Sequence, residues 1–330
     1  MTLQGALYPI LWLVVFPGFL FTGVVGLLIT WIDRKVTARV QMRVGPPWYQ
    51  PFADVLKLLL KETIVPAGSS RLAFLGAPLV ALAGAVLVST MVWVALIWPE
   101  KSFVGDLFVL IYMMVLPSLG LILGGAASRN PLAAAGASRE MKLVLGYELP
   151  FILALAVVIA KSGGAIRLGE IVARQNAGGA IAASVSGALA LIAVILVIQA
   201  KAGLVPFDQA EAETELMGGA LIEYSGAPLA AFRLSKAMLY FALPVFAVAV
   251  LTGGIHSSVA PAGMVLDPLK VLYLVLKIVG VIVIMVLIRN TNPRVRIEHA
   301  VRFFWGPVTA IAGVAVVLAI IGRAYGVAWL

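Results

Sequence analysis

Two ionisable side chains lie inside long apolar runs of this sequence, where they could handle protons. Glu148 stands in Leu-Gly-Tyr-Glu-Leu-Pro-Phe, and Lys277 stands in Val-Leu-Tyr-Leu-Val-Leu-Lys-Ile-Val. An ionised group surrounded by hydrocarbon is costly, so each is a functional candidate by default. If both face a shared wet interior, they could pass protons or hold a charge that responds to them. The alternatives are a carboxylate that only bonds another helix and a lysine whose amine reaches the membrane surface.

The densest group of acids lies between residues 208 and 223. It comprises Asp208, Glu211, Glu213, Glu215 and Glu223. In a helix, Glu211 and Glu215 would share a face, where their like charges would repel. Either basic groups neutralise these acids or some of them stay protonated at neutral pH. A hydrated acidic loop is the alternative, but the segment joins two apolar stretches and is expected to pack against basic loops.

Two other segments carry the basic side chains that could balance these acids. The first contains Asp33, Arg34, Lys35, Arg39 and Arg43, and the second contains Arg129, Arg139, Glu140 and Lys142. Both precede or follow apolar stretches, so they are predicted to lie in loops on the same side of the protein as the acids. They could supply the positive charge that balances these acids.

The elements that must position these residues are membrane-spanning helices. The chain has 330 residues, of which 62% are hydrophobic and 12% charged, whereas soluble domains carry about a quarter charged residues. Eight charge-poor stretches are long enough to cross roughly 30 Å of hydrocarbon. They are residues 9–31, 72–98, 106–128, 143–160, 178–200, 236–254, 270–288 and 304–323. The sequence therefore predicts an all-α integral membrane protein, with a single polytopic domain over residues 1–330.

The distribution of basic residues predicts the orientation of these spans. Seventeen of the 24 Lys and Arg residues fall in the first, third, fifth and seventh loops. Since basic residues stay inside, these loops are predicted to face the cytoplasm, with both termini outside. Residues 52–62 are predicted to form an amphipathic surface helix in the first loop, and residues 166–173 a weaker one on the outer side. Gly120 and Gly124 form a Gly-x-x-x-Gly pair that indicates close helix packing.

The composition also excludes several kinds of site. There is no cysteine, so the chain cannot build a disulfide, a thiolate zinc site or a cysteine-ligated iron–sulfur cluster. The two histidines, His256 and His299, fall in predicted loops, which argues against heme ligation within the spans. The sequence lacks a phosphate-binding loop, a nucleophile elbow and a paired-histidine zinc motif. We therefore expect no catalytic residue, cofactor or metal in this chain, and the spread of its basic residues predicts no nucleic-acid partner.

Three motifs resemble the membrane subunit, called H-type in respiratory complex I, that complex I shares with the energy-converting nickel–iron hydrogenases. They are Asp33 through Pro46, then Gly146-Tyr147-Glu148, and then Pro206-Phe207-Asp208 followed by Glu223-Tyr224-Ser225-Gly226. The resemblance implies a subunit that anchors a peripheral electron-transfer arm and begins a proton pathway. It assigns that pathway to Glu148, Asp208, Glu211, Glu213 and Glu215. It implies that the basic first-loop residues dock the arm.

Three departures from complex I members favour the hydrogenase branch. Gly45-Pro46-Pro47 leads directly to the predicted amphipathic helix, Gly136 through Met141 is similar to hydrogenase-type members, and Lys236 stands where the family often has glutamate. The resemblance then implies hydrogenase-like large and small subunits, an iron–sulfur subunit and antiporter-like membrane subunits as partners. Iron–sulfur clusters and a nickel–iron centre would lie in those partners. The chain would be a non-redox-active subunit in a prokaryotic plasma membrane, coupling ferredoxin-linked electron transfer to ion movement.

Two other functions remain open from the sequence. One is the quinone-chamber subunit of a complex I-type oxidoreductase fed by NADH or a reduced deazaflavin. The other is a stand-alone ion-coupled transporter, for which Glu148 and Lys277 would also be suitable. Transporters of that class often contain two repeated halves, and no such repeat is visible here.

Overall fold

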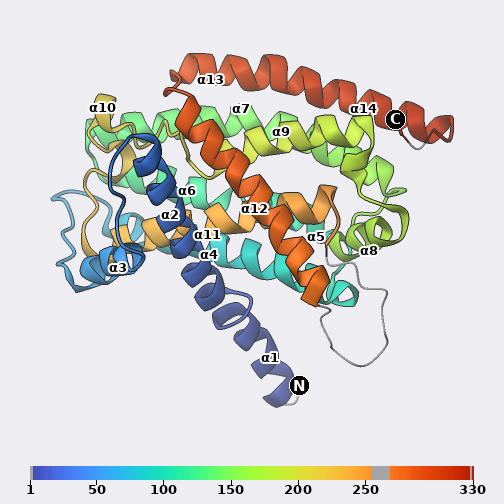
Figure 1. Cartoon of the computed structure of the whole chain (residues 1–330). Helices are drawn as coiled ribbons and strands as arrows, with labels where there is room; N and C mark the ends of the chain where they lie inside the picture. The colour runs from blue at the N-terminus through green and yellow to red at the C-terminus, as the bar shows by residue number, and fades with distance from the viewer. Residues whose placement is uncertain (1–2, 255–267, 328) are drawn as a thin grey trace.

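The computed structural model describes residues 3–254, 268–327 and 329–330. Over these residues the protein is entirely helical, with no strand. Figure 1 shows long helices running side by side in a bundle. Seven helical segments of the described chain are long and apolar enough to cross a membrane. They are Tyr8–Val40, Arg71–Ile97, Asp106–Ala127, Pro131–Lys161, Gly226–Leu251, Pro268–Thr291 and Ile297–Ala324.

The first segment consists of α1 (Leu3–Val14) and α2 (Phe19–Val40), separated by a short break around Pro17. At the break, the Thr22 hydroxyl donates a hydrogen bond to the Pro17 carbonyl over 2.9 Å. Helix α2 continues nine residues beyond the predicted end at residue 31, because the charged residues that ended the apolar stretch still extend the helix. Residues 33–39 of the predicted first loop therefore lie on the last turns of α2.

The next elements pack tightly around small residues. Helix α3 (Gln50–Leu60) covers most of the predicted amphipathic stretch, and α4 (Arg71–Ile97) is followed by α5 (Asp106–Met113) and α6 (Leu116–Ala127). A Cβ on Gly120 would lie 2.7 Å from the Ala77 carbonyl of α4, and one on Gly124 would lie too close to the Tyr224 hydroxyl. The Gly-x-x-x-Gly pair therefore lets α6 approach two neighbours closely.

Helix α7 (Pro131–Lys161) begins twelve residues before the predicted span. Asn130 caps it by accepting a hydrogen bond from the Leu132 amide over 2.8 Å, and Pro131 occupies the first turn. The prediction missed this start because it stopped at the charged residues 139–142. Helices α8 (Leu168–Gly178) and α9 (Val185–Lys201) follow. Helix α9 occupies the predicted fifth span with 17 residues, and it is shorter than each of the seven long apolar segments.

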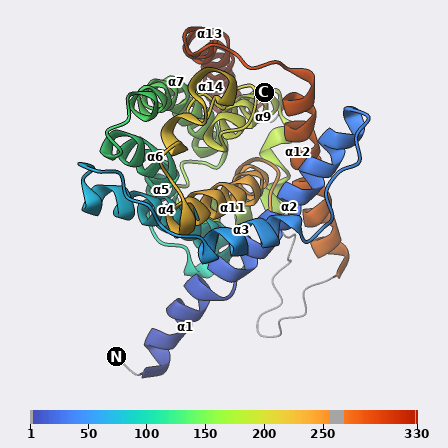
Figure 2. The ribbon, with the colours of Figure 1, turned by 90° about the vertical axis from the view of Figure 1, so that its left-hand side faces the viewer.

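The last part of the chain contains the central helix of the bundle. After the short α10 (Glu213–Leu216), α11 (Gly226–Leu251) runs between α2, α4, α9 and α12 (Pro268–Thr291), as the end-on view in Figure 2 shows. Almost every residue of α11 from Ala237 onward is buried, as expected for a helix that is apolar on all sides. Helix α13 (Ile297–Phe303), a π-helical turn (Phe304–Val308) and α14 (Thr309–Ala324) cover α7 and α9.

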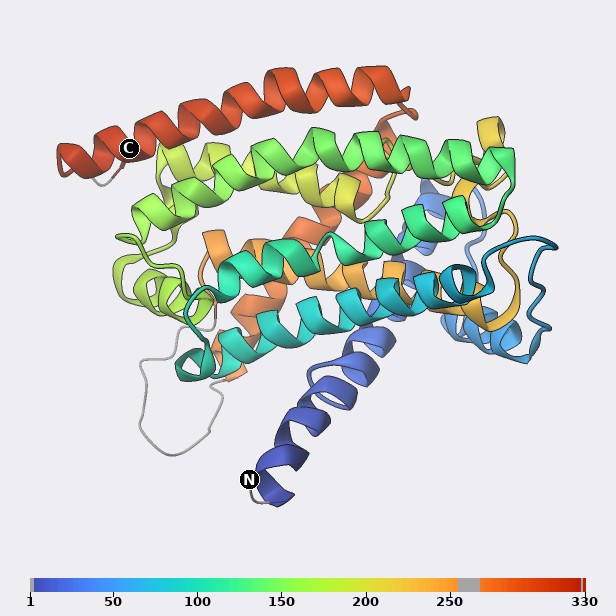
Figure 3. The same cartoon turned by 180° about the vertical axis from the view of Figure 1, so that it is seen from behind.

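The two ends of the bundle differ. Helices α3 and α10 and the beginning of α13 lie at one end, while α8 and the C-terminus lie at the other, as Figures 1 and 3 show from opposite sides. Most candidate residues belong to the α3–α10 end, which the sequence predicts to face the cytoplasm. The functional site is built at that end.

Candidate functional site

A cavity of about 410 Å³ opens at the α3–α10 end, and we call it the entrance cavity. Its walls come from α2, α3, the loop between α9 and α10, α11, and the end of α12 with the loop after it. The charged side chains that line it are Asp33, Arg34, Asp54, Asp208, Glu211, Glu213, Arg233, Lys236, Arg289 and Arg294. Acids and bases are equally represented, so the cavity brings together opposite charges from distant parts of the sequence.

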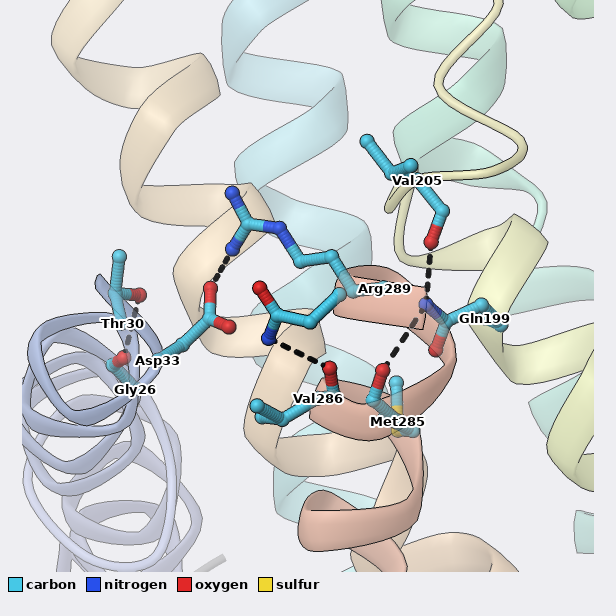
Figure 4. A network of polar contacts seen from close by, with 9 residues as sticks. Gly26, Thr30, Asp33, Gln199, Val205, Met285, Val286 and Arg289 are labelled. Carbon is cyan, nitrogen blue, oxygen red and sulfur yellow. Dashed lines mark hydrogen bonds and ion pairs between the residues drawn. The ribbon is translucent and has the colours of Figure 1, made fainter. Parts of the chain in front are cut away.

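Ion pairs join the elements around the entrance cavity. Asp33 of α2 pairs with Arg289 of α12, as Figure 4 shows, and Asp33 is only 1% exposed. Arg34 contacts Asp54 of α3 over 2.9 Å. Since a buried carboxylate needs a partner, the Asp33 pair fixes α2 against α12. The other carboxylate oxygen of Asp33 is buried and has no hydrogen-bond partner among the described residues, so this acid depends on Arg289 for its charge balance.

Gln199 fixes the chain that follows α9. Its amide donates to the Val205 carbonyl over 2.7 Å and to the Met285 carbonyl of α12 over 3.3 Å, as Figure 4 shows. Gln209 makes a similar bond to the Val295 carbonyl. These amides hold the segment between α9 and α10 against α12 and the loop after it, and so they position the acids that this segment carries.

Asp208 and Glu211 are the two acids of this segment that reach the interior. Asp208 contacts Arg294 over 2.6 Å, and Glu211 contacts Lys236 of α11 over 2.8 Å. Burial raises the pKa of the Asp208 carboxyl, while the nearby Arg294 and Lys236 oppose that rise. Asp208 is therefore an acid whose protonation depends on the charges held beside it.

A second, smaller cavity of about 60 Å³ lies next to the first, and we call it the inner cavity. The two share Gly203, Asp208, Glu211 and Lys236 in their walls. The inner cavity also reaches Glu140, Ser118 and Lys201, among others. Its volume accommodates a few water molecules, and these charged and polar side chains in a largely apolar wall offer them hydrogen-bond partners. Titratable groups therefore follow one another along the walls of two neighbouring cavities, from the α3–α10 end toward the middle of the bundle.

Glu148 lies beyond the inner cavity, paired with Lys201 at the end of α9. The Lys201 side chain is 1% exposed and that of Glu148 is 20% exposed. The Lys201 amine also stands 4.8 Å from the Tyr147 ring and 4.7 Å from the Phe151 ring. Ring faces attract a desolvated cation, so two aromatics and one acid hold the amine. Sequence reasoning missed Lys201 because the predicted span ended one residue before it and left it in a loop.

Several predicted residues lie apart from this series of groups. Glu215 pairs with Arg139 at the surface, and Glu223 accepts a hydrogen bond from Asn130 over 2.5 Å. Lys277 donates to the Thr252 carbonyl over 2.6 Å and lies 4.4 Å from the Tyr273 ring. The structure thus brings Lys277 to the C-terminal end of α11, and it pairs Glu148 with Lys201 instead.

The predicted docking residues divide into exposed and interior ones. Arg39, Arg43, Arg129 and Lys142 are exposed, and Glu213 is exposed at the edge of the entrance cavity. Lys35 donates to the Gly45 carbonyl over 3.2 Å. Asp33 and Glu140 are buried, so they face the interior and do not contribute to a docking surface. His256 lies outside the described residues. No cluster of three or more potential metal ligands occurs in the described part of the chain.

Comparison with known proteins places this arrangement in a family. The sequence profile of the family described as NADH dehydrogenase matches residues 12–320. The H-type subunit of NADH-quinone oxidoreductase from Thermomicrobium roseum is 33% identical, over 94% of this chain and 96% of that protein. The same subunit from Geobacillus thermodenitrificans is 34% identical, over 87% of this chain and 86% of that protein.

A solved structure of an archaeal respiratory membrane complex, the membrane-bound sulfane sulfur reductase, contains a similar chain. It is 28% identical with a TM-score of 0.80, covering 91% of this chain and 96% of that one. The resemblance seen in the three sequence motifs is thereby confirmed, along with the location in a prokaryotic plasma membrane. The chain belongs to the NADH dehydrogenase family, as an H-type, multi-pass membrane subunit of a respiratory complex.

Proposed function

We propose that this subunit anchors a peripheral electron-transfer arm and relays protonation changes from that arm into the membrane. The observation that carries the proposal is the series of titratable groups along the two neighbouring cavities. It begins at Asp208 and Glu211 in the entrance cavity, passes Glu140 in the inner cavity and reaches the pair of Glu148 and Lys201. Charge changes at the cavity mouth alter the proton affinity of the next group along such a series.

The exposed basic residues supply the docking surface. Arg39 and Arg43 on and after the last turn of α2, and Arg129 and Lys142 around the start of α7, are all exposed at the α3–α10 end. Arg139 and Glu215 extend that surface across to α10. An arm seated there would cover the entrance cavity and keep water exchange with the cytoplasm limited, which strengthens the coupling between charges inside it.

The proposed relay leads sideways out of this subunit. Between Glu148 and Lys161, α7 carries no Asp, Glu, Lys or Arg, so the polar groups do not continue to the other end of that helix. The partly exposed Glu148 faces the side of the bundle. We assign the ion crossing to antiporter-like membrane subunits that receive the protonation signal at Glu148.

The spans and the partners complete the proposal. Helix α9 would measure about 26 Å, close to the roughly 30 Å hydrocarbon core, and it serves as the eighth span. Both termini then lie outside. The three departures from complex I members favour an arm of the hydrogenase type, fed by ferredoxin, and the similarity to the sulfane sulfur reductase chain supports a respiratory complex other than complex I. Its iron–sulfur clusters and its nickel–iron or related centre belong to the arm subunits.

The substitution Glu148→Gln in the intact complex, reconstituted into vesicles, tests this function. Glutamine keeps the shape of the side chain and removes its proton exchange, so ion uptake driven by electron transfer is expected to be lost. The matched control is Glu298→Gln, since Glu298 is an exposed acid on α13. Parental ion uptake in the Glu148 variant would remove Glu148 from the relay.

A further inference from the structure

Glu140 is an acid without a basic partner of its own. It is 7% exposed, its carboxyl bonds the Ser118 hydroxyl, and it forms no ion pair with any residue that the structure describes. It nevertheless lines the inner cavity together with Lys201 and Lys236. A buried carboxyl without a basic partner gains more from an approaching cation than an exposed one does.

Lys201 is placed to approach it. Glu140 and Glu148 are eight residues apart on α7, about 12 Å along the helix. Lys201 pairs with Glu148 and lies in the wall of the cavity that Glu140 also lines. A flexible four-carbon stem carries its amine, so a turn of the side chain moves the charge from one glutamate toward the other.

We propose that Lys201 exchanges between Glu148 and Glu140, so that a proton taken up by one glutamate is released by the other. This mechanism rests on the proposed relay and specifies its middle step. When Glu148 gains a proton, the amine loses its acidic partner and becomes a costly buried cation. It moves to Glu140, whose carboxyl then ionises and gives its proton to cavity water. One proton enters, one leaves, and Lys201 stays protonated throughout.

The other charged groups around the inner cavity do not make this exchange. Asp208 is held by Arg294, and Lys236 is held by Glu211. An ionised Glu140 is repelled by Glu211 and attracted by Lys236, so these two largely offset each other. Lys201 is therefore the cation that decides which glutamate of α7 carries the negative charge. The rings of Tyr147 and Phe151 hold its amine in the position seen here.

Infrared difference spectra of the intact complex, recorded as the arm is reduced and reoxidised, test the exchange. The parent is expected to show a carboxyl that gains a proton paired with one that loses a proton. Because the two proton movements are coupled through Lys201, Glu148→Gln, Glu140→Gln and Lys201→Met are each expected to abolish both signals. The control Lys270→Met, at the start of α12, leaves both signals in place. Both signals persisting in Lys201→Met would overturn the exchange.

If Lys201→Met prevents the complex from assembling, a double variant still tests the exchange. Lys201→Met alone leaves Glu148 unpaired, whereas the double variant Lys201→Met with Glu148→Gln removes both buried charges and is expected to recover assembly. A Glu140 signal in that double variant contradicts the exchange. Ion uptake by the same variants separates this exchange from the proposed relay. If Glu148→Gln stops uptake while Lys201→Met and Glu140→Gln retain it, the exchange is wrong and the relay stands. If Glu148→Gln retains uptake, the relay itself is wrong.

Discussion

Four acids at the α3–α10 end and along the proposed relay pair with basic side chains, whereas the buried acids Glu140 and Asp106 form no ion pair among the described residues. Asp33, Asp208, Glu211 and Glu148 each contact an Arg or a Lys from another element. Such pairs contribute little net stability, because desolvation offsets most of the attraction, but the loss of one partner leaves a costly charge. Each pair is therefore sensitive to any change of charge on its partner. That sensitivity makes a chain of pairs suitable as a relay.

Removing Arg294 makes the stability of the protein depend on pH through Asp208. Burial already raises the pKa of Asp208, and Arg294→Met removes the cation that opposes the rise. We expect a loss of about 1–3 kcal/mol at neutral pH, which is less than for a fully buried pair because Arg294 is about a third exposed. Thermal unfolding of the detergent-solubilised complex measures it.

The sign of the pH effect follows from the raised pKa. A carboxyl whose pKa is higher in the folded protein favours folding at low pH, and that contribution is lost as the pH rises through the folded value. The difference between Arg294→Met and the parent is therefore expected to shrink as the pH is lowered. Arg296→Met, an exposed neighbour, is the control. A difference that does not vary with pH would contradict this role of Asp208.

Sequence reasoning found the acids at this scale but not all of their partners. Glu148, Asp208 and Glu211 stand out because acids are rare among apolar residues. Lys201 and Arg294 do not, because a basic residue at the end of a span is ordinary under the positive-inside rule. Only the fold shows that Lys201 turns inward and pairs with Glu148. Lys277 had an equally distinctive sequence setting, and the structure gives it backbone carbonyls as partners.

At the scale of elements, α11 is the central helix against which several other helices pack. Helices α2 and α4 pack along it, and α2 brings Asp33 to the entrance cavity. The contact of α2 with α11 depends on Gly26, where an added Cβ would come too close to the Ala237 carbonyl. The position of the cavity wall therefore depends on one glycine.

Gly26→Ala is expected to destabilise the protein by about 1–3 kcal/mol, because its methyl group forces α2 and α11 apart. Gly23→Ala, one turn earlier on α2, is the control, since its Cβ would lie 3.6 Å from Leu234 in ordinary contact. Thermal unfolding and the yield of assembled complex measure both variants. Equal unfolding temperatures and equal yields for the two variants would show that the close approach at Gly26 does not contribute to stability.

The elements were predicted well where hydropathy alone defines them and less well at their ends. Apolar stretches gave the positions of α4 and α12 because lipid demands long apolar helices. The starts of α7 and α11 and the end of α2 were missed because charged residues continue these helices into the region of the site. Hydropathy marks the hydrocarbon boundary, whereas hydrogen bonding and caps set the helix boundary.

At the scale of the whole molecule, the site, the basic surface and the entrance cavity all lie at one end of the bundle. The other end carries α8 and the C-terminus, as Figure 1 shows. This difference between the two ends suits the proposed role, in which a peripheral arm docks at one end only. The proposal therefore requires the α3–α10 end to face the cytoplasm, as the basic residues predict.

Labelling of introduced cysteines tests that orientation. The chain contains no cysteine, so a single added one is the only site on this chain for a thiol reagent that does not cross membranes. Glu298→Cys and Tyr325→Cys lie at opposite ends of the last span, and both positions are exposed. We expect Glu298→Cys to react only in inverted vesicles stripped of the arm, and Tyr325→Cys only in intact spheroplasts. The reverse labelling pattern would show that the predicted orientation is wrong.

The central claim is that the acids of the entrance cavity couple electron transfer in the arm to ion movement. The most direct test is the number of ions taken up per electron by vesicles carrying the complex with Asp208→Asn and Glu211→Gln together. We predict that the complex remains assembled and transfers electrons, while the ion-to-electron ratio falls toward zero. A parental ratio in that variant would contradict the claim.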